Sequence, residues 1–149
     1  MRALVQRVTR ASVSVEGRSV GSIGHGMVVL LGVARDDTEE RAGKLWRKLR
    51  DLRMFDDERG RADLTLADVG GSVLVVSQFT LYASVRRGRR PSYSDAAPGP
   101  QASALYEAFC ALVRADLGDV QTGVFGADMQ VSLVNDGPYT IWVDTDDLA

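Results

Sequence analysis

Hydrophobic and polar residues alternate along the start of the chain, a pattern that predicts β-strands. The alternation is clearest at Ser12-Val13-Ser14-Val15, just before a turn at Glu16-Gly17. The runs at 27–33 and 73–76 are instead continuously apolar, so we expect these strands to be buried on both faces. Altogether the pattern predicts strands over residues 3–15, 19–23, 27–33 and 73–76.

Two later stretches carry apolar residues at helical spacing. The first helix should begin near Asp37, which we expect to cap its N-terminus, with Glu40 three residues on. A second helix is predicted over residues 101–117, and Gly118 is its expected end. The apolar face of the first helix is formed by Ala42, Leu45, Trp46, Leu49 and Leu52.

The rest of the chain is predicted as loops and three closing strands. Residues 55–71 are polar and loop-like. Residues 83–100 form an Arg-, Ser- and Pro-rich loop, and a loop this long is usually functional or mobile. Apolar runs predict strands over 120–124, 129–134 and 139–143. We therefore expect one α/β domain over residues 1–149, with mostly antiparallel, barrel-like β-sheets and two main helices.

Composition narrows the class of protein. The chain has 149 residues, of which 45% are hydrophobic and 26% charged, which is ordinary for a water-soluble domain. No apolar run approaches the roughly 18 residues of a membrane span. The N-terminal segment carries Arg2 and Arg7 and no small-residue cleavage site, unlike a secretory leader. We expect a cytoplasmic protein with no membrane contact.

The single histidine and single cysteine limit the available chemistry. Cys110 alone cannot form an internal disulfide or a zinc cluster, and we expect it to fill the core beside Phe109. A lone His25 disfavours a histidine metal site or a Ser-His-Asp triad, and its glycine neighbours place it in an exposed turn. We expect no metal and no cofactor.

Charge is unevenly spread although the net charge is only −2. The arginine cluster of the long loop either forms a solvated surface or makes a limited number of phosphate contacts. Its members are Arg86, Arg87, Arg89 and Arg90.

A polar motif, Ser77-Gln78-Phe79-Thr80, follows the buried strand at 73–76. Polar residues at a strand end either satisfy the backbone of the next loop or form a binding site on a rigid scaffold. No histidine is available to activate the hydroxyl of Ser77 or Thr80, which disfavours a serine hydrolase of the usual kind.

A second motif, Asn135-Asp136-Gly137-Pro138-Tyr139-Thr140, separates the last two predicted strands. Gly-Pro is a turn dipeptide, so the simplest interpretation is a hairpin. An X–Pro bond can also be cis at a cost of about 0.5–1 kcal/mol, which would redirect the neighbouring carbonyls into a rigid gauge for ligand stereochemistry. Asn135 shares a face with Val131 and Leu133, so its amide needs partners, which the turn can supply.

Together the two motifs resemble the signatures of the D-aminoacyl-tRNA deacylases, SQxxx and NxGPxT. The resemblance extends along essentially the whole chain. Val5-Gln6-Arg7-Val8 is similar to the opening strand of that family, and Gly123–Met129 to its GxFGAxM segment. The loop at 88–94 is similar to one that more often reads GxRPSF.

The resemblance implies a homodimer that hydrolyses the ester between tRNA and a D-amino acid or glycine, with the active site at the subunit interface. A cis Gly137-Pro138 step would enter the partner's pocket and exclude L side chains. Ser77, Gln78 and the Phe79 N–H would surround the ester. Hydrolysis would be driven by the 2′-hydroxyl of the terminal adenosine, with Thr80 as the alternative nucleophile. Supporting positions would be Arg7, Asn135, Thr140, Phe125, Ala127 and Met129, and the tRNA contacts would be the four loop arginines.

Two other functions remain open from the sequence. One is a non-catalytic tRNA-binding module, in which the motifs are turns and the arginines make the contacts. The other is a hydrolase of small D-amino-acid derivatives that does not need tRNA, which the arginine cluster mildly disfavours.

Overall fold

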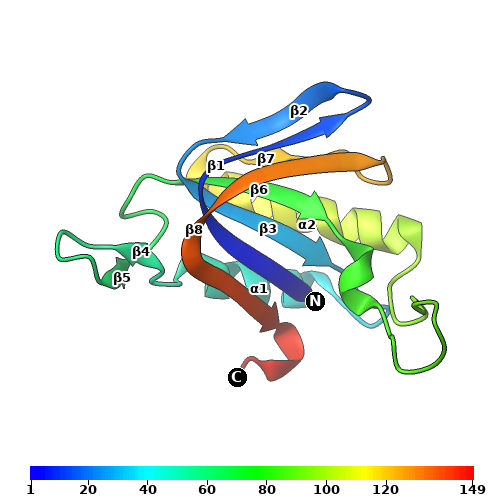
Figure 1. Cartoon of the computed structure of the whole chain (residues 1–149). Coiled ribbons are helices and arrows are strands. Elements are labelled where there is room, and N and C mark those ends of the chain that lie inside the picture. Colours follow the sequence, from blue (N-terminus) through cyan, green and yellow to red (C-terminus); the bar gives the residue numbers. More distant parts are fainter.

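A six-stranded sheet forms the centre of the computed structural model, which describes residues 1–149 (Figure 1). The strand order is β2-β1-β3-β6-β7, and β8 also pairs with β1. β1 is antiparallel to β2, β3 and β8, whereas the β3–β6 and β6–β7 pairs are parallel. The strands are β1 (Arg2–Val15), β2 (Arg18–Ile23), β3 (Gly26–Gly32), β6 (Ser72–Ser77), β7 (Gln121–Thr122) and β8 (Met129–Asp144).

The long strand β1 makes the sheet barrel-like. Its first half pairs with β3 and its second half with β2, so the second half curls over one face of the sheet. The turn into β2 has positive φ at Glu16 (49°) and Gly17 (76°), as a tight hairpin of this hand requires. The curl encloses a small buried cluster of Val8, Ala11, Val13, Ile23, Val28, Leu74 and Val76.

Two helices, α1 (Glu39–Arg50) and α2 (Gly99–Leu117), cover the opposite face (Figure 1). The larger core lies between this face and the helices, and includes Val29 and Val75 of the sheet with Leu45 of α1 and Phe109 of α2. The predicted α2 end is confirmed, because Gly118 stops the helix with a left-handed φ of 78°. No helix is long and apolar enough to cross a membrane.

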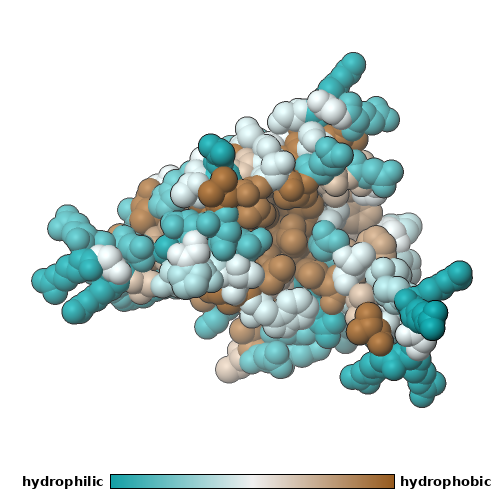
Figure 2. Space-filling view, in the orientation of Figure 1, coloured by the Kyte–Doolittle hydropathy of each residue, from teal (hydrophilic) through white to brown (hydrophobic).

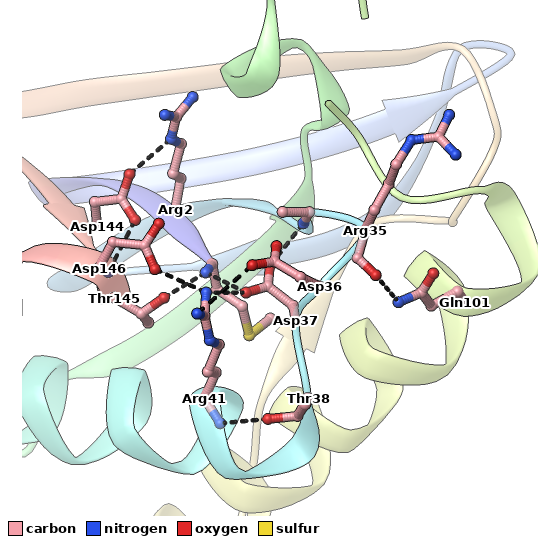
Figure 3. Close-up of polar contacts among 12 residues, drawn as sticks. Arg2, Arg35, Asp36, Asp37, Thr38, Arg41, Gln101, Asp144, Thr145 and Asp146 are labelled. Atoms are coloured by element: carbon pink, nitrogen blue, oxygen red, sulfur yellow. Dashed lines mark hydrogen bonds and ion pairs between the residues drawn. The ribbon is translucent and has the colours of Figure 1, made fainter. Parts of the chain in front are cut away.

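The predicted start of α1 is wrong by one residue. The capping side chain is that of Thr38, which accepts from the Arg41 N–H at 3.3 Å. Asp37 is buried and otherwise engaged: its carboxylate binds the Met1 ammonium at 2.6 Å and the Ala34 N–H at 2.6 Å (Figure 3). Arg41 adds an ion pair to Asp146, so this cluster ties both ends of the chain to α1.

The hairpin expected near the C-terminus is also wrong. The two predicted strands at 129–134 and 139–143 belong to one strand, β8, which leaves β1 only at a bulge, where residues 136–139 lie opposite Arg7 alone. The pairing continues across two register shifts, between Gln6 and Val8 and between Val8 and Arg10.

Two smaller differences concern regions without a strong pattern. The predicted loop at 55–71 contains a short two-stranded sheet, β4 (Phe55–Asp56) and β5 (Ala62–Leu64). The predicted strand at 120–124 shrinks to the two residues of β7. Short 3-10 helices follow β6 at η1 (Phe79–Tyr82) and β8 at η2 (Thr145–Asp147).

Candidate active site

The parallel strands β3 and β6 end side by side, with Leu31 opposite Ser77. A cavity of about 450 Å³ opens at these strand ends, closed on other sides by the start of α2 and by Phe125 and Gly126. The carboxyl ends of parallel strands are a common place for ligands, because loops diverge there. Three members of the first motif line the cavity: Ser77, Gln78 and Phe79.

Gln78 is held from two sides. Its backbone N–H donates to the Leu31 carbonyl at 2.8 Å, which continues the sheet by one residue. Its side-chain amide donates to the Thr80 hydroxyl. Thr80 itself does not line the cavity. The Gln78 side-chain oxygen and the Ser77 hydroxyl have no hydrogen-bond partner within the chain, so both are available to a ligand.

Aromatic side chains form the entrance and the floor of the cavity. Phe79 and Tyr93 stand edge to face at the rim, with ring centroids 5.0 Å apart, and are 55% and 40% exposed. On the floor, Tyr106 packs against Phe125 and donates its hydroxyl to the Val75 carbonyl at 2.9 Å. Burial raises the pKa of Tyr106 above its ordinary range, so its phenol remains a neutral donor.

Arg35 is a cavity residue that the sequence did not single out. It follows β3 and donates from Nε to the Ser94 carbonyl at 2.6 Å. Its own carbonyl accepts from the Gln101 amide at 2.8 Å (Figure 3). Arg35 thus joins the arginine-rich loop to the start of α2 beside the cavity. The residues next to Arg35 in the sequence do not predict these contacts, because the two partners are 59 and 66 residues away.

The Gly137-Pro138 step lies in the middle of β8, and its peptide bond is cis. Both residues are exposed, and neither lines the cavity of its own chain. The two motifs are therefore not brought together within one chain.

Arg7 and Asn135 brace this part of β8. The Arg7 guanidinium is buried, lies 4.2 Å from the Tyr139 ring centroid, and donates to the Asp136 carbonyl at 3.2 Å and the Met54 carbonyl at 2.7 Å. Nε also pairs with the Asp136 carboxylate at 3.0 Å. The Asn135 amide donates to the Arg7 and Tyr139 carbonyls at 2.9 and 3.0 Å, so its partners lie on β1 and at the end of the bulge, and not in a hairpin turn.

The other supporting positions are spread along β8 and the segment before it. Thr140 accepts a hydrogen bond from the Gln6 amide at 3.1 Å. Phe125 lines the cavity, whereas Ala127 and Met129 do not. Met129 packs instead beside Gly123.

The remaining candidates lie outside the cavity. The four loop arginines are exposed, and none forms an ion pair within the chain. Cys110 is fully buried, and burial raises the pKa of its thiol to about 11, so it remains an unreactive core residue as expected. His25 is exposed and packs edge-on against Phe55.

Comparison with known proteins places this chain among the deacylases, a class of hydrolases. The chain belongs to the D-Tyr-tRNA(Tyr) deacylase family, whose model matches residues 4–144. A protein of Anaeromyxobacter dehalogenans named D-aminoacyl-tRNA deacylase is 57% identical over 97% of both chains. A protein of Escherichia coli with the same name is 54% identical, over 96% of this chain and 99% of its own.

Two solved structures share the fold. One, described as a c-Myc DNA unwinding element binding protein, superposes with a TM-score of 0.91 and 41% identity, covering 97% of this chain and 98% of its own. The other, a probable eukaryotic D-amino acid tRNA deacylase, gives a TM-score of 0.86 at 19% identity, covering 95% and 97%. The expected α/β, barrel-like fold with two helices is confirmed.

Proposed function

We propose that this protein hydrolyses the ester bond of D-aminoacyl-tRNA, releasing the free D-amino acid and the tRNA. The observation that carries the proposal is the cavity, where Ser77, Gln78 and Phe79 stand together in a chain of the deacylase family. In this role the protein acts in the cytoplasm, where it removes D-amino acids before they reach the ribosome. Glycyl-tRNA is a second substrate, because glycine has no side chain to be rejected.

The mechanism relies on position rather than on an activated protein nucleophile. No base is near Ser77, and the Thr80 hydroxyl is occupied by the Gln78 amide. An aminoacyl ester is already activated, so orientation and stabilisation of the oxyanion are sufficient. In this mechanism the Ser77 hydroxyl and the Phe79 N–H donate to the developing oxyanion, Gln78 orients the ester, and the 2′-hydroxyl of the terminal adenosine activates the reaction.

Chirality is read by the Gly137-Pro138 step of a second subunit. This step is exposed, absent from its own cavity, and braced by Arg7 and Asn135, as a rigid projection into a partner would be. Its carbonyls would bind the substrate's amino group and leave no room for an L side chain. Rejection through backbone atoms tolerates many different D side chains.

The proposed assembly is a twofold dimer with its active sites at the interface. β8 supports it, because this strand exposes Val131, Val134 and Trp142, of which Trp142 is 48% exposed. Figure 2 shows apolar side chains gathered in the middle of the face that Figure 1 presents, with hydrophilic ones projecting at its margins. Exposed apolar surface bordered by polar residues is typical of a protein interface.

One observation favours a different function, a nucleic-acid-binding module without catalysis. The solved structure at 41% identity is described as a DNA-binding protein, and the loop arginines of this chain are free to contact phosphate. A hydrolase of small D-amino-acid derivatives is the third candidate.

One assay separates the three. The protein is incubated with D-aminoacyl-tRNA and, separately, with a small D-amino-acid ester, and release of the amino acid is followed. We expect rapid release from the tRNA substrate and slow release from the ester. Release from neither substrate, with tRNA binding measured separately, would support the non-catalytic module. Equal rates on both substrates would support the small-molecule hydrolase.

A second substrate tests the mechanism. When the 3′-terminal adenosine is replaced by its 2′-deoxy form, with the amino acid on the 3′ oxygen, hydrolysis should nearly stop. Normal turnover of this substrate would refute the role assigned to the 2′-hydroxyl.

A further inference from the structure

A small polar depression lies in the arginine-rich loop, separate from the catalytic cavity. Two backbone hydrogen bonds between Ser84 and Ser92, of 2.8 and 2.9 Å, close part of this loop into a short hairpin. We call the depression the serine–arginine cup. It is lined by Ser84, Arg86, Arg87, Ser92, Ser94 and Asp95.

The cup and the catalytic cavity share one wall. Along Ser92-Tyr93-Ser94 the side chains alternate: both serines line the cup, whereas Tyr93 lines the cavity and packs against Phe79. The wall is fixed from the cavity side, where Arg35 Nε donates to the Ser94 carbonyl at 2.6 Å. The cup therefore lies directly beside the cavity, with only this segment between them.

The lining chemistry of the cup suits a phosphate group. Ser92 Oγ donates to Ser94 Oγ at 3.3 Å, which leaves the hydroxyls of Ser84 and Ser94 as donors. The guanidinium groups of Arg86 and Arg87 are exposed with no ion-pair partner within the chain. Two guanidinium groups outweigh the one carboxylate of Asp95, so the cup has a net positive charge. Arginine with hydroxyl donors is a common phosphate-binding set. Arg89 and Arg90 belong to the same loop but do not line the cup.

We propose that the cup binds the phosphodiester that joins the terminal adenosine of tRNA to the preceding nucleotide. The inference rests on the proposed function, because that function puts the terminal ribose and its ester in the cavity. The 5′-phosphate belongs to the same nucleotide as the ester, so it is the tRNA phosphate closest to the reacting bond. Binding of this phosphate in the cup fixes the ribose relative to Ser77 and Gln78. Arg86 and Arg87 are therefore positioning residues.

The first test compares two double variants that remove the same charge from the same loop. We expect Arg86→Ala/Arg87→Ala to lower kcat/KM for D-aminoacyl-tRNA by about tenfold, mainly through KM, because charge-assisted hydrogen bonds are lost. The matched control, Arg89→Ala/Arg90→Ala, should lose only about two- to threefold through weaker long-range attraction. Equal losses of kcat/KM in the two variants, or no loss in either, would contradict the proposal that the cup binds the phosphodiester.

The second test changes the substrate instead of the protein. A short aminoacylated oligonucleotide is made with an uncharged methylphosphonate at its last linkage. For the wild-type protein, kcat/KM on this substrate should be about tenfold lower than on the same oligonucleotide with a normal phosphodiester. The difference in kcat/KM between wild type and Arg86→Ala/Arg87→Ala should disappear. If that difference persists without the phosphate charge, the two arginines bind something else and the proposal is wrong.

A third variant should improve binding, which loss of structure would not do. Asp95→Asn removes the only negative charge of the cup, and we expect KM to fall about two- to threefold. An unchanged or higher KM would count against the cup.

Binding of tRNA that carries no amino acid, measured in parallel, separates the two proposals. If the wild type binds this tRNA through the cup but hydrolyses no aminoacyl-tRNA, the proposed function alone is rejected. If hydrolysis does not depend on Arg86 and Arg87, the cup alone is rejected.

Discussion

At the scale of single residues, the site is built from polar side chains that orient one another. Gln78 is fixed by Thr80, and the Gly137-Pro138 segment by Arg7 and Asn135. The sequence could indicate Ser77, Gln78 and Asn135, because polar residues at strand ends or on apolar faces are unusual. It could not indicate Arg35, whose partners come from distant parts of the chain.

Replacing Thr80 tests whether its hydroxyl positions Gln78 or attacks the ester. Thr80→Val keeps the shape and removes the acceptor, so kcat should fall about three- to tenfold, as for one lost hydrogen bond. Thr80→Ser keeps the hydroxyl and should restore most of the activity. If Thr80→Val abolishes turnover while folding and tRNA binding remain normal, Thr80 is the nucleophile.

Replacing Arg7 tests the brace behind Gly137-Pro138. Arg7→Met keeps the bulk but leaves the Met54 carbonyl and the Asp136 carboxylate without their donor, so the free energy of unfolding should fall by about 3 kcal/mol. Urea unfolding measures this. The control is Arg10→Met on the same strand, where an exposed side chain has no partner and the change should stay within about 0.5 kcal/mol. Similar values for the two variants would contradict the brace.

At the scale of elements, the alternating, continuously apolar and helical patterns of the sequence predicted β1, β2, β3, β6 and both helices. The prediction failed where tertiary contacts override local signals. Gly137-Pro138 is typical of a turn, yet the chain only bulges away from β1 over residues 136–139, because Arg7 and Asn135 hold both strands together. Asp37 reads as a helix cap, yet the Met1 ammonium occupies its carboxylate, and Thr38 caps the helix instead.

The parallel β3–β6 pair, which carries the cavity at its end, depends on one close approach. A Cβ on Gly26 would lie 1.9 Å from the Ser72 carbonyl oxygen, so Gly26→Ala must separate the strands where their pairing begins. We expect a loss of about 2–3 kcal/mol in the free energy of unfolding. Gly24→Ala, two residues away, meets no atom within 4 Å and should change it by less than about 0.5 kcal/mol. A tolerated Gly26→Ala would refute this requirement.

At the scale of the whole molecule, the two sequence motifs of one chain lie apart. The cavity lies at the end of β6, and the Gly137-Pro138 step projects from β8. The sequence motifs indicated both parts. They could not show that the parts lie apart, because that depends on β8 continuing without a hairpin. Two copies facing each other through β8 would reunite them.

Charge introduced on β8 tests this assembly. Val134→Arg should produce monomers, measured by light scattering at micromolar concentration, and should greatly reduce deacylation, because each cavity loses its partner's Gly137-Pro138. Val85→Arg introduces the same charge on the loop, at a side chain that is 75% exposed, and should leave the dimer intact. A fully active Val134→Arg monomer would show that one chain is sufficient.

The most direct test of the central claim is the rate of amino-acid release from two substrates that differ only in chirality. The same tRNA is charged with D-tyrosine or L-tyrosine and incubated with the wild-type protein under identical conditions. The proposed function predicts rapid release of D-tyrosine, with L-tyrosyl-tRNA decaying no faster than in buffer. Equal release from both would contradict a chirality-reading deacylase, and release from neither would contradict a deacylase altogether.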